Sequence, residues 1–292
     1  MKKLYYFLVG LFMAVGLGSC SSDENEETLT DKYELTFQVI NYELISLNNN
    51  TRATTPTKAP HFVMAIYDAR TNKLVEEPTI HKSGSAEGGT FSARLPKGEY
   101  NFVFLAYYTD RTLFPEDPTA IHWDAQVVDN TYQKNLALSI DEDTAPQHDI
   151  VLSRAVGVFT LNTKATPVPQ NFDHFRVQMQ GGSFQLNALT GYAGENVTRD
   201  YAFLSKKDVA GDTEISQSAY AFLPQRECDV DITMIAEDKN NREIRKRTFR
   251  KVPMKINQMT RYTGDFFGET ELDNDFSVRI ATEEWETVDL EF

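Results

Sequence analysis

Apolar side chains recur at every second position along much of this chain. The clearest alternations cover residues 33–39 and 175–179, where each apolar residue is followed by a polar one. Successive side chains of a β-strand point to opposite faces, so a period of two predicts strands with one buried face. Amphipathic helix patterns are scarce, and the sequence therefore predicts an all-β chain built as β-sandwiches.

Two continuous apolar runs, residues 62–67 and 100–108, predict strands buried on both faces. Clusters of glycine, proline and polar residues at 82–89, 96–98 and 237–241 predict turns between strands.

A polar, proline-containing break at residues 141–147 divides the chain after the tether almost in half. We expect a domain boundary near Ser153, with an N-terminal β-sandwich over 33–152 and a C-terminal one over 153–292. No repeat is visible residue by residue, but the halves are long enough to share a fold.

The N-terminus has the features of an export signal over residues 1–19. Lys2 and Lys3 precede an apolar stretch that is too short to cross a bilayer, and small residues stand before Cys20. The sequence Leu-Gly-Ser-Cys resembles the bacterial lipobox, which implies cleavage before Cys20 and lipid, including a palmitate-type acyl chain, on that cysteine. The alternative is an ordinary secretory cleavage site with a cysteine beside it.

Residues 20–32 predict an acidic tether, because no apolar residue occurs before Leu29. Its acidic residues resemble the signal that sends lipoproteins of Bacteroidetes to the outer face of the outer membrane; they are Asp23, Glu24, Glu26 and Glu27. A solvated linker without an export role is the alternative.

The charge balance opposes nucleic acid as a partner. The chain has 29 basic and 43 acidic residues, and loss of Lys2 and Lys3 with the signal leaves a net charge of −16. Such a charge repels phosphate backbones. With Cys20 lipidated, Cys228 has no cysteine to pair with, so apolar burial must stabilise the fold.

The order of segments resembles the fimbrial subunit lipoproteins of Bacteroidetes, especially the FimB-like minor or anchor subunits of the fimbrillin superfamily. The matching stretches are LTFQV (35–39), FVMAIYD (62–68), LPKGEYNFV (95–103), LSRAVGV (152–158) and VPMKINQMTRYTGDFF (252–267). The resemblance implies two tandem transthyretin-like β-sandwiches of Greek-key type. It also implies a non-enzymatic role in a surface fimbrium, with other fimbrial subunits as partners through β-strand addition.

In that family, stalk subunits are cut after an arginine near the N-terminus and lose their first strand, whereas anchor subunits keep both lipid and strand. Arg52 lies in a polar loop and is the candidate processing site, with Ala53 as the new N-terminus. A loop that is never cut is the alternative.

The C-terminus ends within an alternating pattern of Val288, Leu290 and Phe292. These residues are either a donor strand for a neighbouring subunit or the closing strand of their own domain.

Catalytic and metal-binding motifs are absent from the sequence, and neither a cofactor nor a metal is expected. Cys228 falls in register with Val230 and Ile232, which predicts a core position. Residues 242–255 predict one strand of a hairpin with 229–236, whose Asp229 and Asp231 the basic strand would neutralise. Asp273 and Asp275 predict an acidic turn rather than a calcium loop.

Two further features concern glycans. Asp143-Thr144-Ala145 resembles the short O-glycosylation motif of exported Bacteroidetes proteins, which makes Thr144 a candidate acceptor. One alternative to the anchor subunit is a stalk or tip subunit processed by a protease. The other is a surface lipoprotein that binds a host or glycan ligand, with Trp123 and Trp285 as the candidate exposed platforms, although packing beside the terminal strand is favoured for Trp285.

Overall fold

A computed structural model describes residues 32–42, 59–164, 166–194, 199–202, 211–212, 214–268, 277–281 and 287–289. These residues form strands joined by turns, together with one 3-10 helix, η1 (Asp124–Gln126). The predicted all-β class is therefore confirmed. Among the same residues, no helix has the length and apolarity needed to span a membrane.

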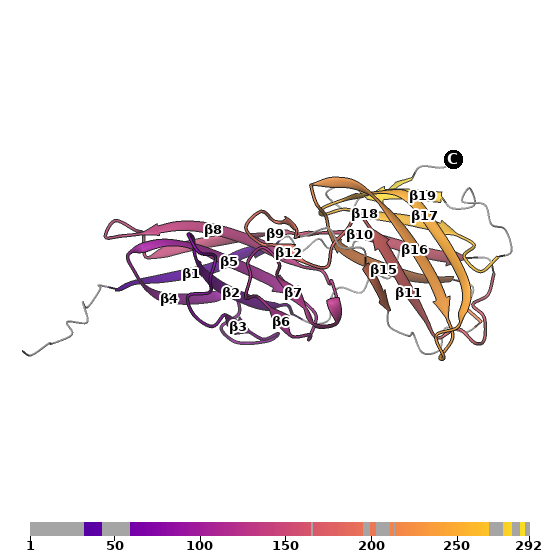
Figure 1. The fold of residues 1–292 in the computed structure, drawn as a ribbon, viewed down its shortest axis with the longest axis horizontal. Coiled ribbons are helices and arrows are strands. Elements are labelled where there is room, and N and C mark those ends of the chain that lie inside the picture. Colours follow the sequence, from indigo (N-terminus) through magenta and orange to yellow (C-terminus); the bar gives the residue numbers. More distant parts are fainter. Residues whose placement is uncertain are drawn as a thin grey trace, which may run out of the picture. The chain divides into compact units, whose positions relative to one another are not determined.

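The first sheet has seven strands from residues up to Arg154, and they appear in indigo to magenta in Figure 1. Its strands are β1 (Lys32–Tyr42), β2 (His61–Asp68), β3 (Thr79–His81), β4 (Thr90–Pro96), β5 (Gly98–Tyr107), β8 (Tyr132–Ile140) and β9 (Gln147–Arg154). Their order across the sheet is β3-β2-β5-β8-β9-β1-β4. The sheet folds over one core, because side chains from both of its arms, such as Phe37 of β1 and Phe102 of β5, belong to the same buried cluster.

The burial of these strands follows their sequence patterns. In β4, buried and exposed residues alternate along the strand, as the period of two requires. The inner residues of β2 and β5, such as Met64 and Phe104, join the core under β1, while their alternate residues, such as Val63 and Leu105, enter a second cluster. Burial of β2 and β5 on both faces confirms the prediction from the continuous apolar runs.

The remaining strands form a five-stranded and a four-stranded sheet. They are β10 (Val156–Lys164), β11 (His174–Gln180), β14 (Arg199–Ala202), β15 (Glu214–Phe222), β16 (Glu227–Glu237), β17 (Glu243–Lys255), β18 (Met259–Gly264), β19 (Ser277–Ala281) and β20 (Thr287–Asp289). The orders are β15-β10-β18-β19-β20 and β14-β11-β16-β17. Phe159 of β10 and Phe249 of β17 lie in the cluster shared by the two sheets, which makes this arrangement a β-sandwich.

The same pairing scheme occurs twice along the chain. β1 pairs antiparallel with β4 and parallel with β9, and β10 pairs antiparallel with β15 and parallel with β18. The pairs β2–β3, β2–β5 and β5–β8 likewise correspond to β11–β14, β11–β16 and β16–β17, all antiparallel. The schemes differ in one pair, because β8 hydrogen-bonds to β9 whereas their counterparts β17 and β18 lie in separate sheets. Apart from that pair, the two stretches of sequence share one strand topology although their residues do not align visibly.

Two small hairpins are additions to the repeated scheme. One is β6 (Leu113–Phe114) with β7 (His122–Trp123), and the other is β12 (Leu186–Asn187) with β13 (Tyr192–Ala193). Ile121 and Leu186 form an isolated β-bridge, and the ring of Trp123 stacks on Phe222 with centroids 6.2 Å apart. The insertions thus pack against each other in a cluster that joins residues from both stretches.

The chain changes sheets between β9 and β10, within two residues of the expected boundary at Ser153. By their contacts, however, residues Lys32–Phe292 form one compact unit. The division into domains at 152/153 therefore stays a prediction.

Candidate functional site

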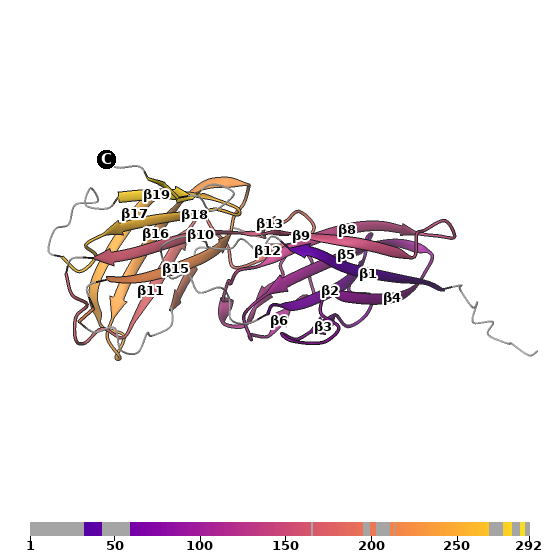
Figure 2. The ribbon, with the colours of Figure 1, turned by 180° about the vertical axis from the view of Figure 1, so that it is seen from behind.

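The first strand, β1, occupies an interior position in its sheet. It hydrogen-bonds antiparallel to β4 from Lys32 to Gln38 and parallel to β9 from Thr36 to Tyr42, and Figure 2 shows it beside both neighbours. A parallel pair needs a crossover connection, so these partners are far apart in sequence. Removal of β1 would therefore leave two strands, β4 and β9, without their shared neighbour.

The side chains of β1 also complete the core. Phe37 has no solvent exposure, and its ring lies 4.7 Å from that of Phe102 and 5.2 Å from that of Phe104, between centroids. His148, the partner of Phe37 on β9, stacks on the Phe37 ring with centroids 5.3 Å apart. Burying a side chain of this size contributes about 1.5–3 kcal/mol, so β1 is held by packing as well as by two ladders.

Several predicted site residues lie outside the described part of the chain. They are Cys20, Asp23, Glu24, Glu26, Glu27, Arg52, Trp285, Leu290 and Phe292. The acidic-turn residues Asp273 and Asp275 lie outside it as well. These assignments stay predictions.

The C-terminal strands extend the five-stranded sheet beyond the repeated scheme. β19 pairs antiparallel with β18, and β20 pairs with β19, placing Val288 opposite Ile280. No strand of the first sheet corresponds to β19 or β20. In this structure Val288 therefore pairs with a strand of its own chain. Its assignment to a donor strand or to a closing strand stays a prediction.

Thr144 is held inside the turn that joins β8 to β9. Its single hydroxyl proton is shared between the Ser139 carbonyl oxygen, 3.1 Å from Oγ1, and an Asp141 carboxylate oxygen at 3.0 Å, and Oγ1 accepts from the Asp141 N–H at 2.9 Å. A glycan on this oxygen would replace the proton and remove the hydrogen bonds that it donates. The candidate glycosylation site therefore stays a prediction, and glycosylation there would remove hydrogen bonds that stabilise this turn.

The expectation that Trp123 is an exposed glycan platform is wrong. Its side chain is 1% exposed, because the β6–β7 insertion folds it against Tyr107 and Phe222. The loop around Trp123 shows no regular alternation of apolar and polar residues, so its sequence gives no sign that the tryptophan is buried. Here the loop residues pack against β12 rather than facing solvent.

The predicted hairpin of 229–236 with 242–255 is confirmed by β16 and β17, which pair from Glu227–Lys255 to Glu237–Glu243. Asp231 accepts a hydrogen bond from the Lys251 N–H at 2.8 Å and has Arg250 at 3.9 Å. Asp229, by contrast, has no cation within ion-pair distance among the described residues. The predicted neutralisation therefore holds for one of the two aspartates.

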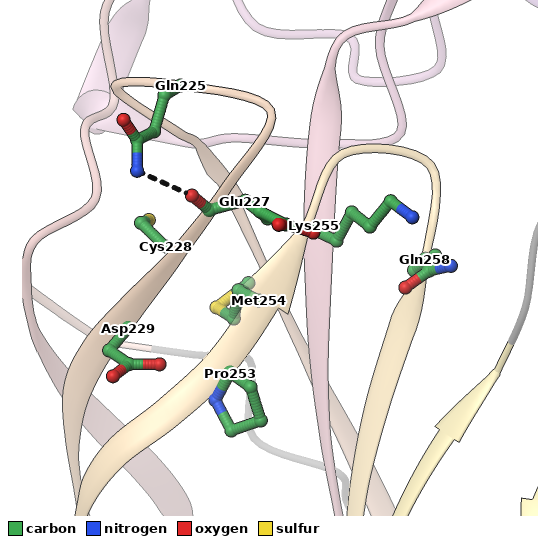
Figure 3. A pocket seen from close by; sticks show the side chains of 8 residues that line it. All are labelled: Gln225, Glu227, Cys228, Asp229, Pro253, Met254, Lys255 and Gln258. Atoms are coloured by element: carbon green, nitrogen blue, oxygen red, sulfur yellow. Dashed lines mark hydrogen bonds between the residues drawn. The ribbon is translucent and has the colours of Figure 1, made fainter.

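The open end of this hairpin borders a hollow of about 470 Å³. Figure 3 shows its eight lining side chains, which come from β16 and the turn before it, from β17, and from the loop after β17: Gln225, Glu227, Cys228, Asp229, Pro253, Met254, Lys255 and Gln258. Cys228 is half-buried and packs against the core, as its register predicts. Burial, and then the charge of Asp229, raises the pKa of its thiol.

A buried ionic cluster closes the other end of β16. The Glu237 carboxylate, with the side chain 3% exposed, accepts from Arg176 Nε at 2.9 Å and lies 3.1 Å from His174 Nε2. The other ring nitrogen of His174 lies 2.9 Å from Asp173. Sequence reasoning missed this cluster, because Glu237 ends an apolar run and its partners come from a strand sixty residues earlier.

The strand pairing defines the structural class of the protein. It is an all-β protein in which seven strands of the first stretch correspond to seven strands of the second. The chain belongs to a family of unknown function, DUF6562, whose family model matches residues 26–290. No curated protein sequence matches the chain.

The comparison with solved structures gives matches of low sequence identity, among them three from Bacteroides, Parabacteroides and Porphyromonas species. A candidate adhesin from Bacteroides thetaiotaomicron is 12% identical, with 90% of this chain and 100% of that chain covered and a TM-score of 0.49. A fimbrial assembly protein from Parabacteroides distasonis is 12% identical, with 89% and 99% covered and a TM-score of 0.42. The fimbrial anchor protein Mfa2 from Porphyromonas gingivalis is 11% identical, with 89% and 100% covered and a TM-score of 0.41.

Proposed function

We propose that this chain is a non-enzymatic structural subunit of a cell-surface fimbria. It is held to the outer membrane by lipid on Cys20, and it attaches or terminates the fibre through β-strand addition to other fimbrial subunits. The observation that carries the proposal is the interior position of β1, the first strand after the acidic tether.

Because of that position, loss of the lipid-bearing segment by cleavage would also leave the sheet without one of its interior strands. β1 ends at Tyr42, before Arg52, so one cut after Arg52 would remove the lipidated cysteine and the strand together. A subunit that keeps Cys20 keeps the space between β4 and β9 filled, and no incoming strand can enter it. Such a subunit ends the fibre on that side and holds it to the membrane.

The link to the next subunit must then use a segment outside the repeated scheme. β19 and β20 are such a segment, since they add to the edge of β18 and have no counterpart in the first sheet. A strand pair at a sheet edge can leave without opening the core between the two layers of a sandwich.

A deletion strain complemented with cysteine variants tests the anchor role. Without the chain, we expect fimbriae to be released into the medium, as seen by electron microscopy and by the fimbrial content of cell and medium fractions. Wild type and the control Cys228→Ser restore attachment, whereas Cys20→Ser does not. Attached fimbriae of normal length in the deletion strain would refute the proposal.

A further inference from the structure

The hollow beside the β16–β17 hairpin presents polar groups from three stretches of chain. Cys228 lies opposite Met254 on the core side of the hairpin, while Glu227 lies opposite Lys255 and Asp229 opposite Pro253. Gln225 shapes the turn at the rim by donating from Nε2 to the Glu227 carbonyl oxygen at 2.7 Å. At about 470 Å³ the hollow is within the range of small-ligand sites, about 300–1,000 Å³.

Gln258 is the most buried polar side chain that lines the hollow. The residue is 8% exposed, and its backbone is satisfied by bonds with Lys255 and Val158. Its side-chain amide, in contrast, makes no hydrogen bond with any described residue. Neither amide atom is among the fully buried side-chain atoms that lack a partner, so the carboxamide is accessible from the hollow, where it can both donate hydrogen bonds to a ligand and accept them from it.

The charged side chains that line the hollow form no ion pairs with the described residues. Within the described part of the chain, the carboxylates of Glu227 and Asp229 and the ammonium of Lys255 take part in no ion pair. The carboxylates offer acceptors only and the ammonium offers donors only, while the carboxamides of Gln225 and Gln258 offer both. Pro253 adds apolar surface to the lining, and Met254, which is 2% exposed, packs behind it in the core.

This combination selects among ligand classes. Two carboxylates against one ammonium disfavour a phosphate or sulfate, and the chain as a whole is strongly acidic. A lone cation would be opposed by Lys255, and the described residues contain no cluster of three metal-ligating side chains. A neutral sugar fits this lining, because each of its hydroxyl groups can both donate and accept a hydrogen bond and its ring has an apolar C–H face.

We propose that this hollow is a binding site for a short neutral oligosaccharide, with Gln258 and Lys255 as its main polar contacts. The site lies on β16, β17 and the following loop, away from β1, β4 and β9, so it does not depend on the proposed fimbrial role. It replaces the buried Trp123 as the place where this chain would contact a glycan.

Cys228 supplies a reporter inside the site. The full-length chain is treated with N-ethylmaleimide at mildly alkaline pH, and labelling of Cys228 is followed by peptide mass spectrometry. The probes are maltotriose, cellotriose, mannotriose and chitotriose, with the dipeptide glycylglycine for comparison. A bound sugar at about ten times its dissociation constant slows labelling about tenfold, because only the empty site reacts.

Substitutions then separate the site from nonspecific shielding. Gln258→Leu and Lys255→Ala are each expected to weaken protection about tenfold in sugar concentration, which is the effect of one lost hydrogen bond. The controls Gln147→Leu and Lys246→Ala change exposed residues outside the hollow and leave protection unchanged. Unfolding midpoints of all four variants show whether the fold is retained.

The proposal is overturned if none of the sugars protects Cys228 at millimolar concentration, or if glycylglycine protects and the sugars do not. Protection that survives undiminished in folded Gln258→Leu and Lys255→Ala would overturn it as well. Fimbrial attachment in cells that carry these variants is expected to be normal, which separates this site from the anchor role.

Discussion

At the scale of single residues, a few buried side chains connect strands that are distant in sequence. Phe37 joins the first strand to the core of its sheet, and Glu237 joins β16 to β11 through Arg176 and His174. Such residues contribute through tertiary contacts rather than through local propensity. Their substitution therefore tests the packing directly.

Phe37→Ala is expected to lower the free energy of unfolding by about 3–5 kcal/mol, since it removes a fully buried ring and leaves a cavity beside Phe102 and Phe104. Urea unfolding followed by circular dichroism measures the change. Phe114→Ala is the control, because Phe114 is exposed, and it should cost less than about 1 kcal/mol. Equal effects would show that β1 does not pack as described.

Glu237→Gln removes the negative charge that both Arg176 Nε and His174 Nε2 approach. We expect a loss of about 3 kcal/mol, at the low end for a broken buried ion pair because Arg176 is partly exposed. Urea unfolding again gives the value. Glu34→Gln, at an exposed carboxylate 3.9 Å from Arg94, should change stability by less than about 0.5 kcal/mol; a loss as large as that of Glu237→Gln would contradict the account.

The reactivity of Cys228 should depend on Asp229. Burial and the nearby carboxylate raise the pKa of the thiol, so the thiol is protonated and reacts slowly near neutral pH. Asp229→Asn removes the charge that opposes the thiolate, which lowers the pKa and speeds iodoacetamide labelling at any pH below the pKa. Labelling rates across pH measure the shift, and Asp124→Asn, outside the hollow, should leave the profile unchanged.

At the scale of elements, the proposed role depends on the first strand. β1 is an interior strand with two neighbours, so its removal would leave space for a strand from another subunit. The proposed anchor role keeps β1 in place, whereas the alternative role of a stalk subunit would require its release.

A disulfide between β1 and β4 distinguishes these cases. Thr36 and Ser92 lie directly opposite each other and are both exposed, and the Cα separation of such pairs, about 4.5–5.5 Å, suits a disulfide. We expect the double variant Thr36→Cys, Ser92→Cys to form the cross-link in oxidant-treated cells and to keep fimbriae attached. The two single variants are the controls. Loss of attachment that is reversed by a reductant would mean that β1 must leave.

The alternating sequence patterns predicted β1 and β11 because burial on one face leaves a period of two. The parallel pairing of β1 with β9 could not be predicted, since it joins residues about 110 positions apart and depends on tertiary packing. Trp123 was assigned to the surface because its loop has no period. The hollow was missed because its lining joins the start of β16, the end of β17 and the loop beyond, which are far apart in sequence.

At the scale of the whole molecule, the chain uses one strand scheme twice and then adds to it. The first copy begins with β1, which belongs to the scheme as the counterpart of β10, whereas β19 and β20 extend the second copy beyond the scheme. In the proposed function, the first copy follows the lipid-bearing segment in the sequence, and the second copy carries the strands that contact the fibre.

In the proposed function, the chain remains lipidated at Cys20 and keeps β1 when it works at the cell surface. Intact-protein mass and N-terminal analysis of the chain purified from surface fractions that contain fimbriae will show whether it does. We expect a chain that begins at Cys20 and carries the mass of the added lipid. A chain that begins at Ala53 without lipid would refute the anchor role.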